Sequence, residues 1–202
     1  MRRLRAMLFP RDTLRILLLA AVLVGWGGTA TAGVNRTEAG AFIVVHELLL
    51  PGSPESIYDA VTGDISGWWD HSFSDSPKAI YIEPKPGGGF YEIFDDEGNG
   101  ALHATVIYAD RGKLLRFEGP LGLSGSAVSL VCSFELEPWV QGDSTRVKLT
   151  VSAAGQIGAG WAEIVDQVWY HFLFEQLKPY VESGKHLKKT RGDGSSGDPK
   201  PE

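Results

Sequence analysis

The sequence predicts an α+β fold in which a curved antiparallel sheet of seven strands surrounds a long C-terminal helix, with two short helices after the first strand. Three observations predict this arrangement. An apolar run over 42–50 ends at a Pro-Gly-Ser-Pro break, six alternating apolar and polar runs follow between 79 and 153, and residues 160–183 carry a helical pattern. Because no long helix alternates with the strands, a parallel sheet is excluded.

The N-terminal 32 residues have the pattern of a secretory signal peptide. They contain five arginines, an apolar core of nine residues at Ile16–Val24, and the small-residue site Ala30-Thr31-Ala32. The apolar core is too short to cross a bilayer of about 30 Å. We therefore expect cleavage after Ala32, a periplasmic or secreted bacterial protein, and no stable membrane insertion after cleavage. An uncleaved anchor is the alternative.

The remaining chain is expected to divide into three parts. Residues 33–40 form a short polar leader, 41–183 form the folded domain, and 184–202 form a disordered tail. The tail is expected to be disordered because it consists mainly of Gly, Ser, Lys, Asp and Pro, which cannot bury enough apolar surface to order the chain.

Charge and cysteine content exclude several classes of function. Without residues 1–32, 14 basic and 24 acidic residues remain, for a formal net charge of −10. This balance argues against binding to nucleic acid or to anionic lipid headgroups. The single cysteine, Cys132, excludes an internal disulfide and a Cys-based zinc finger. Its apolar strand context favours a small core residue, with an activated nucleophile as the alternative.

The first strand, Phe42–Leu50, is apolar on both faces, which predicts a place inside the sheet and not at a solvated edge. Ser53 is a suitable N-cap and Pro54 suits the first helical position, so a short helix is expected to run to about Val61.

A second short helix is expected at Ile65–Trp69, after a turn at Thr62-Gly63-Asp64. Trp68, Trp69 and Phe73 make an aromatic cluster within this short connector, a composition that commonly covers the end of a core.

Six further strands are expected to follow one another as an antiparallel meander. Gly- and Asp-rich separators of this length are typical of hairpin turns. The predicted strands are Ala79–Glu83, Gly89–Asp95, Ala101–Ala109, Lys113–Gly119, Ala127–Glu137 and Arg146–Ala153. Three inward faces are predicted: Leu102, Ala104, Val106 and Tyr108; Val128, Leu130, Cys132, Phe134 and Leu136; and Val147, Leu149, Val151 and Ala153.

The helix predicted at Gly160–Ser183 is apolar around most of its circumference. Its principal stripe is Trp161, Val165, Val168 and Phe172, flanked by Ile164 and Trp169. A sheet of seven antiparallel strands twists and curls, and this helix alone is long enough to cover its apolar concave side. We expect a hydrophobic cavity between the two.

Several segments resemble the START/Bet v 1-like (SRPBCC) superfamily with its helix-grip fold, and more narrowly the activator of Hsp90 ATPase homologue 1-like domains. The resemblance covers about residues 41–183, and the order and spacing of the motifs support it. An exported copy has no cytosolic Hsp90 to activate, so the resemblance implies the fold and not that activity. The motifs are Leu50–Thr62 (LPGSPESIYDAVT), Gly67-Trp68-Trp69, Gly87–Tyr91 (GGGFY), Gly98-Asn99-Gly100, Arg111–Leu115 (RGKLL) and the aromatic C-terminal helix.

The leading hypothesis is a non-catalytic carrier or sensor that holds a small hydrophobic molecule or lipid in the cavity. The residues expected to surround the ligand are Trp69, Phe90, Glu92, Val106, Tyr108, Phe117, Leu130, Phe134, Leu149, Val165, Val168, Trp169, Phe172 and Gln176. One alternative is a polyketide cyclase/dehydrase-like enzyme, which the resemblance suggests and which requires an acid–base pair in the cavity. The other is a protein-interaction, co-chaperone-like module that exposes Trp68, Trp69 and Phe73.

No catalytic motif is present, and we expect neither a cofactor nor a metal site, because the five histidines show no i, i+4 pair. Glu92 either lies on the wet face of its strand or is a buried carboxylate with a raised pKa that could pair with His46 or His171. His103 is expected to face solvent. Gln176 could bind the polar end of a ligand or hold a loop in place.

Overall fold

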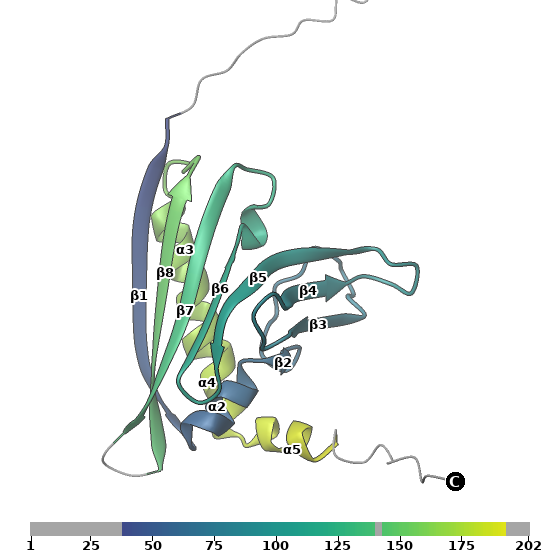
Figure 1. The fold of residues 1–202 in the computed structure, drawn as a ribbon, viewed down its shortest axis with the longest axis vertical. Helices are drawn as coiled ribbons and strands as arrows, with labels where there is room; N and C mark the ends of the chain where they lie inside the picture. The colour runs from purple at the N-terminus through teal and green to yellow at the C-terminus, as the bar shows by residue number, and fades with distance from the viewer. Residues whose placement is uncertain (1–37, 140–142, 193–202) are drawn as a thin grey trace, which may run out of the picture. The chain divides into compact units, whose positions relative to one another are not determined.

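The computed structural model describes residues 38–139 and 143–192; the predicted signal peptide and most of the predicted leader lie outside them. The described residues form one antiparallel sheet with the strand order β1-β8-β7-β6-β5-β4-β3-β2 (Figure 1). Its strands are β1 (Gly40–Pro51), β2 (Gly63–Asp64), β3 (Ala79–Ile82), β4 (Gly89–Ile93), β5 (Gly100–Asp110), β6 (Leu114–Gly119), β7 (Val128–Trp139) and β8 (Ser144–Gly155).

One continuous helical segment, which we call the C-terminal helix, packs against the sheet. It comprises α3 (Trp161–Tyr170), the π-helix η2 (His171–Leu177) and α4 (Lys178–Glu182), and in Figure 1 it crosses behind β8, β7 and β6. Its buried face includes Trp169, Phe172 and Leu173, which join the core formed by the strands. The helix-grip arrangement predicted from the sequence is therefore confirmed.

The first connection contains one helix and not two. Helix α2 (Pro54–Ala60) begins as predicted, with the Ser53 hydroxyl accepting a hydrogen bond from the Ser56 amide at 3.3 Å. The second predicted helix, Ile65–Trp69, is a single turn in which the Trp69 amide donates to the Ile65 carbonyl at 2.9 Å. This turn cannot extend towards its N-terminus, because the preceding residues form β2 and pair with β3. Strand β2 was not predicted, so the sheet has eight strands and not seven.

Strand β1 lies at the edge of the sheet, so its predicted internal position is wrong. Its inward face is buried through Val44 and Leu48, whereas Ile43 and Val45 on the other face are 68% and 50% exposed. The apolar pattern on both faces therefore reflects an exposed apolar surface and not burial between two strands.

Two β-bulges in β5 change which of its side chains face the core. Phe90 of β4 pairs with Ala104 and Tyr91 pairs with Leu102, so His103 is an extra residue that turns inward beside Ala104. A second bulge between Val106 and Tyr108 leaves Tyr108 45% exposed. Leu102 is also exposed, at 53%. The predictions that His103 faces solvent, that Leu102 and Tyr108 face inward and that Tyr108 lines the cavity are therefore wrong, because each bulge adds one residue to an otherwise alternating pattern.

The predicted disordered tail begins with a helix, α5 (Lys185–Gly192). Gly184 adopts a positive φ of 68° directly after α4, which ends that helix. His186 then packs beside Tyr180 and is 7% exposed, so the start of the segment is packed against the domain. Residues 193–202 lie outside the described part of the chain. Within that part, no helix is long and apolar enough to cross a membrane.

The buried side of the C-terminal helix should contribute more to stability than its open side. Leu173 is fully buried, whereas Ile164 is 55% exposed. We expect Leu173→Ala to lower the free energy of unfolding by about 2–5 kcal/mol, because it leaves a cavity against the sheet. Ile164→Ala, the matched control, should cost less than about 1 kcal/mol. Urea denaturation followed by circular dichroism measures both, and equal losses would contradict this packing.

Candidate functional site

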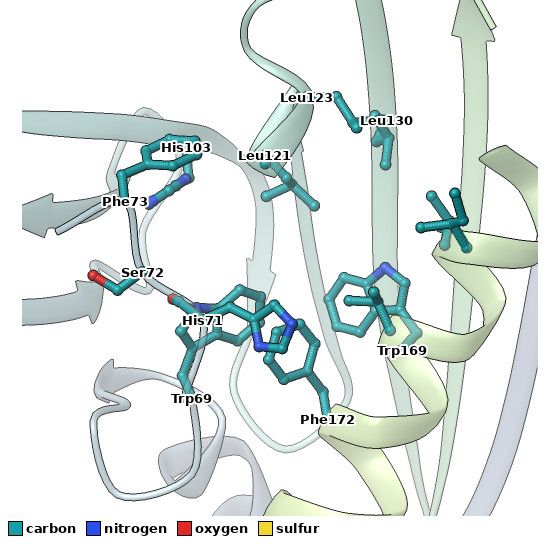
Figure 2. Close-up of a pocket in the computed structure, with 14 residues that line it drawn as sticks. Trp69, His71, Ser72, Phe73, His103, Leu121, Leu123, Leu130, Trp169 and Phe172 are labelled. Carbon is teal, nitrogen blue, oxygen red and sulfur yellow. Dashed lines mark hydrogen bonds between the residues drawn. The ribbon is translucent and has the colours of Figure 1, made fainter. Parts of the chain in front are cut away.

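A cavity of about 300 Å³ lies between the C-terminal helix, the segment 69–73 and the short 3-10 helix η1 (Leu121–Leu123). Figure 2 shows Trp169 and Phe172 projecting from the helix toward Trp69 and His71 of the segment opposite. The cavity lining is predominantly apolar, with three polar side chains. The lining residues are Trp69, His71, Ser72, Phe73, His103, Leu121, Gly122, Leu123, Leu130, Ile164, Val165, Val168, Trp169 and Phe172.

Trp69 is the centre of the aromatic part of the cavity. Its ring stacks on Phe172 with the ring centroids 3.9 Å apart and the planes 17° apart, and it meets Phe90 and Trp169 edge-on at 5.0 and 5.9 Å. Its indole N–H donates to the His71 carbonyl at 2.8 Å. These contacts hold the segment 69–73 against the C-terminal helix. They also fix the orientation of the Trp69 ring in the cavity wall.

Helical periodicity explains which side chains of the C-terminal helix line the cavity. Val165, Val168 and Phe172 belong to the stripe predicted from the sequence and line the cavity together with Trp169. Across from them, Leu130 comes from β7 and Leu121 from η1. Leu121 has a φ of 49°, a left-handed conformation that costs a leucine on the order of 1 kcal/mol or more.

Six of the residues predicted to surround a ligand line this cavity: Trp69, Leu130, Val165, Val168, Trp169 and Phe172. Five others are packed into the core and do not reach it: Phe90, Val106, Phe117, Phe134 and Leu149. Tyr108 points outward, Glu92 lies beneath the 72–74 loop, and Gln176 donates to Asp70 at 2.9 Å.

The sequence analysis missed the loop and bulge residues of the lining, chiefly His71, Ser72, His103 and the η1 residues. The connector 70–78 has no periodic pattern, so nothing in the sequence indicates which of its side chains turn toward the helix. The Gly- and Pro-containing run 119–125 marks a loop but not its position. The aromatic pair Trp69 and Phe73 was the available signal, and both residues do line the cavity.

Glu92 is a fully buried carboxylate that holds the loop beside the cavity. It accepts hydrogen bonds from the hydroxyl of Ser72, from the amide of Phe73 at 2.9 Å and from the amide of Ser74 at 3.0 Å. The Nε2 of His103 lies 2.9 Å from its other oxygen and donates to it. Both carboxylate oxygens are therefore fully used by protein donors.

Of the two interpretations of Glu92, burial is correct, but the expected rise in its pKa is wrong. Burial alone would raise the pKa of this carboxyl group, yet the hydrogen bonds from Ser72, Phe73, Ser74 and His103 outweigh burial and hold the pKa below its usual value. Glu92 therefore remains ionised at neutral pH. A carboxylate in this state is suited to holding a loop and not to donating a proton.

The acid–base pairs considered for a cyclase-like enzyme do not form. His46 interacts with Asp166, with 3.1 Å between Nε2 and Oδ1, and His171 lies between Asp70 and Glu175. Neither histidine contacts Glu92, whose histidine partner is His103. Of the three aromatic residues considered for a protein-interaction surface, Trp68 is buried, Trp69 is partly buried, and Phe73 alone is half exposed.

A second polar cluster lies at the edge of the cavity. The Nε2 of His171 is 2.7 Å from Asp70 Oδ2, and its Nδ1 is 2.7 Å from Glu175 Oε2. His71 Nδ1 is 2.9 Å from the other oxygen of Asp70. The hydrogen bonds to Glu175 and then Asp70 raise the pKa of His171. Burial opposes ionisation of Asp70, but hydrogen bonds from His71 and His171 lower its pKa overall.

Comparison with known proteins supports the fold. No protein-family model and no curated protein sequence matches the chain. Among solved structures, a protein from Rhizobium loti matches with a TM-score of 0.51 at 19% identity, over 67% of this chain and 94% of that one. An uncharacterised protein from Rhizobium leguminosarum matches with a TM-score of 0.52 at 12% identity, over 74% and 99%.

A dimeric Aha1 protein from Colwellia psychrerythraea is also similar, with 23% identity over 71% of this chain and 98% of that chain and a TM-score of 0.49. The two Rhizobium matches, with TM-scores above 0.5, show a shared fold, and at 12–19% identity they carry no information about activity.

Glu92 should make the free energy of unfolding depend on pH in the acid range. Because its pKa in the folded state is lowered, its contribution is fully present above about pH 4.5 and is lost as the pH falls through the folded-state value. We expect Glu92→Gln to cost about 2–3 kcal/mol at pH 7, since the amide can satisfy fewer of the loop donors. The difference should shrink below pH 4.5. Urea denaturation across pH measures it.

The matched control for this experiment is Glu97→Gln, which changes an exposed loop carboxylate. We expect it to leave the pH profile of stability unchanged. If Glu92→Gln were as stable as the parent protein at pH 7, the proposed role of Glu92 in holding the loop would be contradicted.

Proposed function

We propose that this chain is an exported member of the START/Bet v 1-like superfamily that binds a small hydrophobic molecule in the cavity beneath its C-terminal helix. The observation that carries the proposal is the cavity of about 300 Å³ lined by Trp69, Trp169, Phe172 and aliphatic side chains. Apolar lining with a few polar groups at one side is the usual composition of a ligand pocket.

The cavity volume limits the size of the ligand. A cavity of about 150 Å³ accommodates one benzene molecule. A volume of about 300 Å³ therefore suits a ligand of roughly two fused rings or a medium-length alkyl chain, if the protein does not open further. His71 lies at one side of the lining with its side chain half exposed, where it is placed to meet a polar end of the ligand.

Binding is better supported than catalysis. Glu92, the buried carboxylate beneath the loop, is ionised and occupied by loop donors and His103, so it has no proton to donate to a molecule in the cavity. An interaction surface made of Trp68, Trp69 and Phe73 also loses support, because stacking on Phe172 uses a face of Trp69 and Trp68 is buried.

Titration with 1-naphthylamine, a neutral probe of two fused rings whose fluorescence shifts in apolar surroundings, tests ligand binding. We expect saturable binding, with Val168→Trp weakening it by at least about tenfold because the larger side chain fills the cavity. Val45→Trp, on the exposed face of β1, should bind the probe as the parent protein does. Absence of saturable binding, or equal binding by Val168→Trp, would contradict the proposal.

Export is tested separately. Expression of the full chain in a Gram-negative host should yield periplasmic protein whose N-terminus is Gly33, because Ala30 and Ala32 occupy the positions that signal peptidase reads. Intact-mass measurement of the periplasmic fraction checks this. Ala32→Arg should block cleavage, whereas a cytoplasmic product that retains residues 1–32 in the parent chain would contradict export.

A further inference from the structure

Asp70, His71 and His171 present metal-ligating atoms to one another at the edge of the cavity. One ligand atom from each of the three lies within 4.8 Å of the others. No metal site was predicted from the sequence, because His71 and His171 are far apart in the chain and show no i, i+4 spacing. The stacking of Trp69 on Phe172 brings them together, since each of these aromatic residues lies within two positions of a member of the cluster.

The π-helix η2 positions His171 and Gln176, which meet Asp70 from the C-terminal helix. His171 and Gln176 both reach the same oxygen of Asp70, at 2.7 and 2.9 Å. Residues five apart in an α-helix differ by about 140° around the axis and do not readily share a partner. The wider turn of the π-helix brings them onto one face, and π-helical turns in proteins frequently lie at functional sites.

His171 is flanked by carboxylate oxygens on both ring nitrogens. Glu175 accepts from Nδ1 at 2.7 Å, and Asp70 faces Nε2 at the same distance. An ionised carboxylate accepts hydrogen bonds and does not donate them, so both ring nitrogens of His171 face acceptor oxygens, and a metal ion bound at Nε2 would take the place of a proton there. A histidine whose outer nitrogen is held by a carboxylate is the usual arrangement around bound zinc.

We propose that Asp70, His71 and His171 bind a divalent transition metal ion, of which Zn²⁺ fits best, and that Glu175 orients His171 toward it. Two imidazoles and one carboxylate are a ligand set that zinc uses with a fourth, open position. Zinc ligands at about 2.0–2.1 Å from the metal lie roughly 3.3 Å from each other. The 2.7 and 2.9 Å separations, which run to the two different oxygens of Asp70, would widen by about half an ångström on binding, and the ligand atoms that are farthest apart, within 4.8 Å, would approach each other by up to about 1.5 Å.

The proposed site adjoins the cavity but does not depend on it. His71 lines the cavity as well as the cluster, so the open position of the metal would be available to an oxygen atom of a bound molecule. This extension rests on the proposed ligand-binding function. Metal binding itself does not, and the two can be measured independently.

Isothermal titration of the chelator-treated full-length chain with Zn²⁺ alone tests the site. We expect one ion per chain with micromolar or tighter affinity, and His171→Ala should weaken binding beyond the 10–100-fold that loss of an outer partner costs. His46→Ala is the matched control, because His46 forms a similar ion pair with Asp166 elsewhere and should leave binding unchanged. Affinity weaker than about 0.1 mM, or equal affinity in His171→Ala, would overturn the proposal.

Glu175→Gln and Co²⁺ substitution provide a second test. The variant keeps the shape of the side chain but weakens its hold on His171, so we expect a 10–100-fold loss of Zn²⁺ affinity. Bound Co²⁺ should give the visible absorption of a four- or five-coordinate ion, and His71→Ala should remove it. An unaltered spectrum in His71→Ala would overturn the assigned ligand set. Naphthylamine binding in chelator should persist if the cavity function is correct, whatever the metal result.

Discussion

The contact between Trp69 and Phe172 is the interaction on which the rest of the site depends. It joins a short connector near the start of the domain to the helix at its end, across a centroid distance of 3.9 Å. Without it, neither the aromatic part of the cavity nor the cluster of Asp70, His71 and His171 would have a fixed geometry.

The loop that follows Trp69 is held at two separate points. At its start, Asp70 interacts with His171 and Gln176 of the π-helix, and at its middle the amides of Phe73 and Ser74 donate to Glu92. A buried carboxylate is costly unless its hydrogen bonds are satisfied, and here the loop backbone satisfies them. The charge of Glu92 therefore keeps an irregular segment in place beside an apolar cavity, where hydrophobic contacts alone would not specify the loop conformation.

Much of the fold could be predicted because local patterns decide it. Alternation in β7 and β8, the Ser53-Pro54 helix start and the stripe Val165, Val168 and Phe172 each report the local environment of the chain, and the structure agrees with all of them. The errors in side-chain orientation within β5 arise where one extra residue changes the period. The bulges in β5 reverse the orientation of Tyr108 and bring His103 inward, and hydrophobicity carries no signal for either bulge.

The candidate site was less predictable, because it is built from tertiary contacts between irregular segments. His171 and Glu175 are four residues apart and visible as a pair, but their partner Asp70 comes from a connector with no periodicity. The π-helical turn that aligns Gln176 with His171 likewise has no marker in the sequence. The resulting arrangement is an apolar cavity with one polar edge, formed where the sheet, the helix and a constrained loop meet. His71 lies at that edge with its side chain 53% exposed and its Nδ1 paired with Asp70, so the polar edge faces solvent while the aromatic and aliphatic side chains form the enclosed part of the cavity.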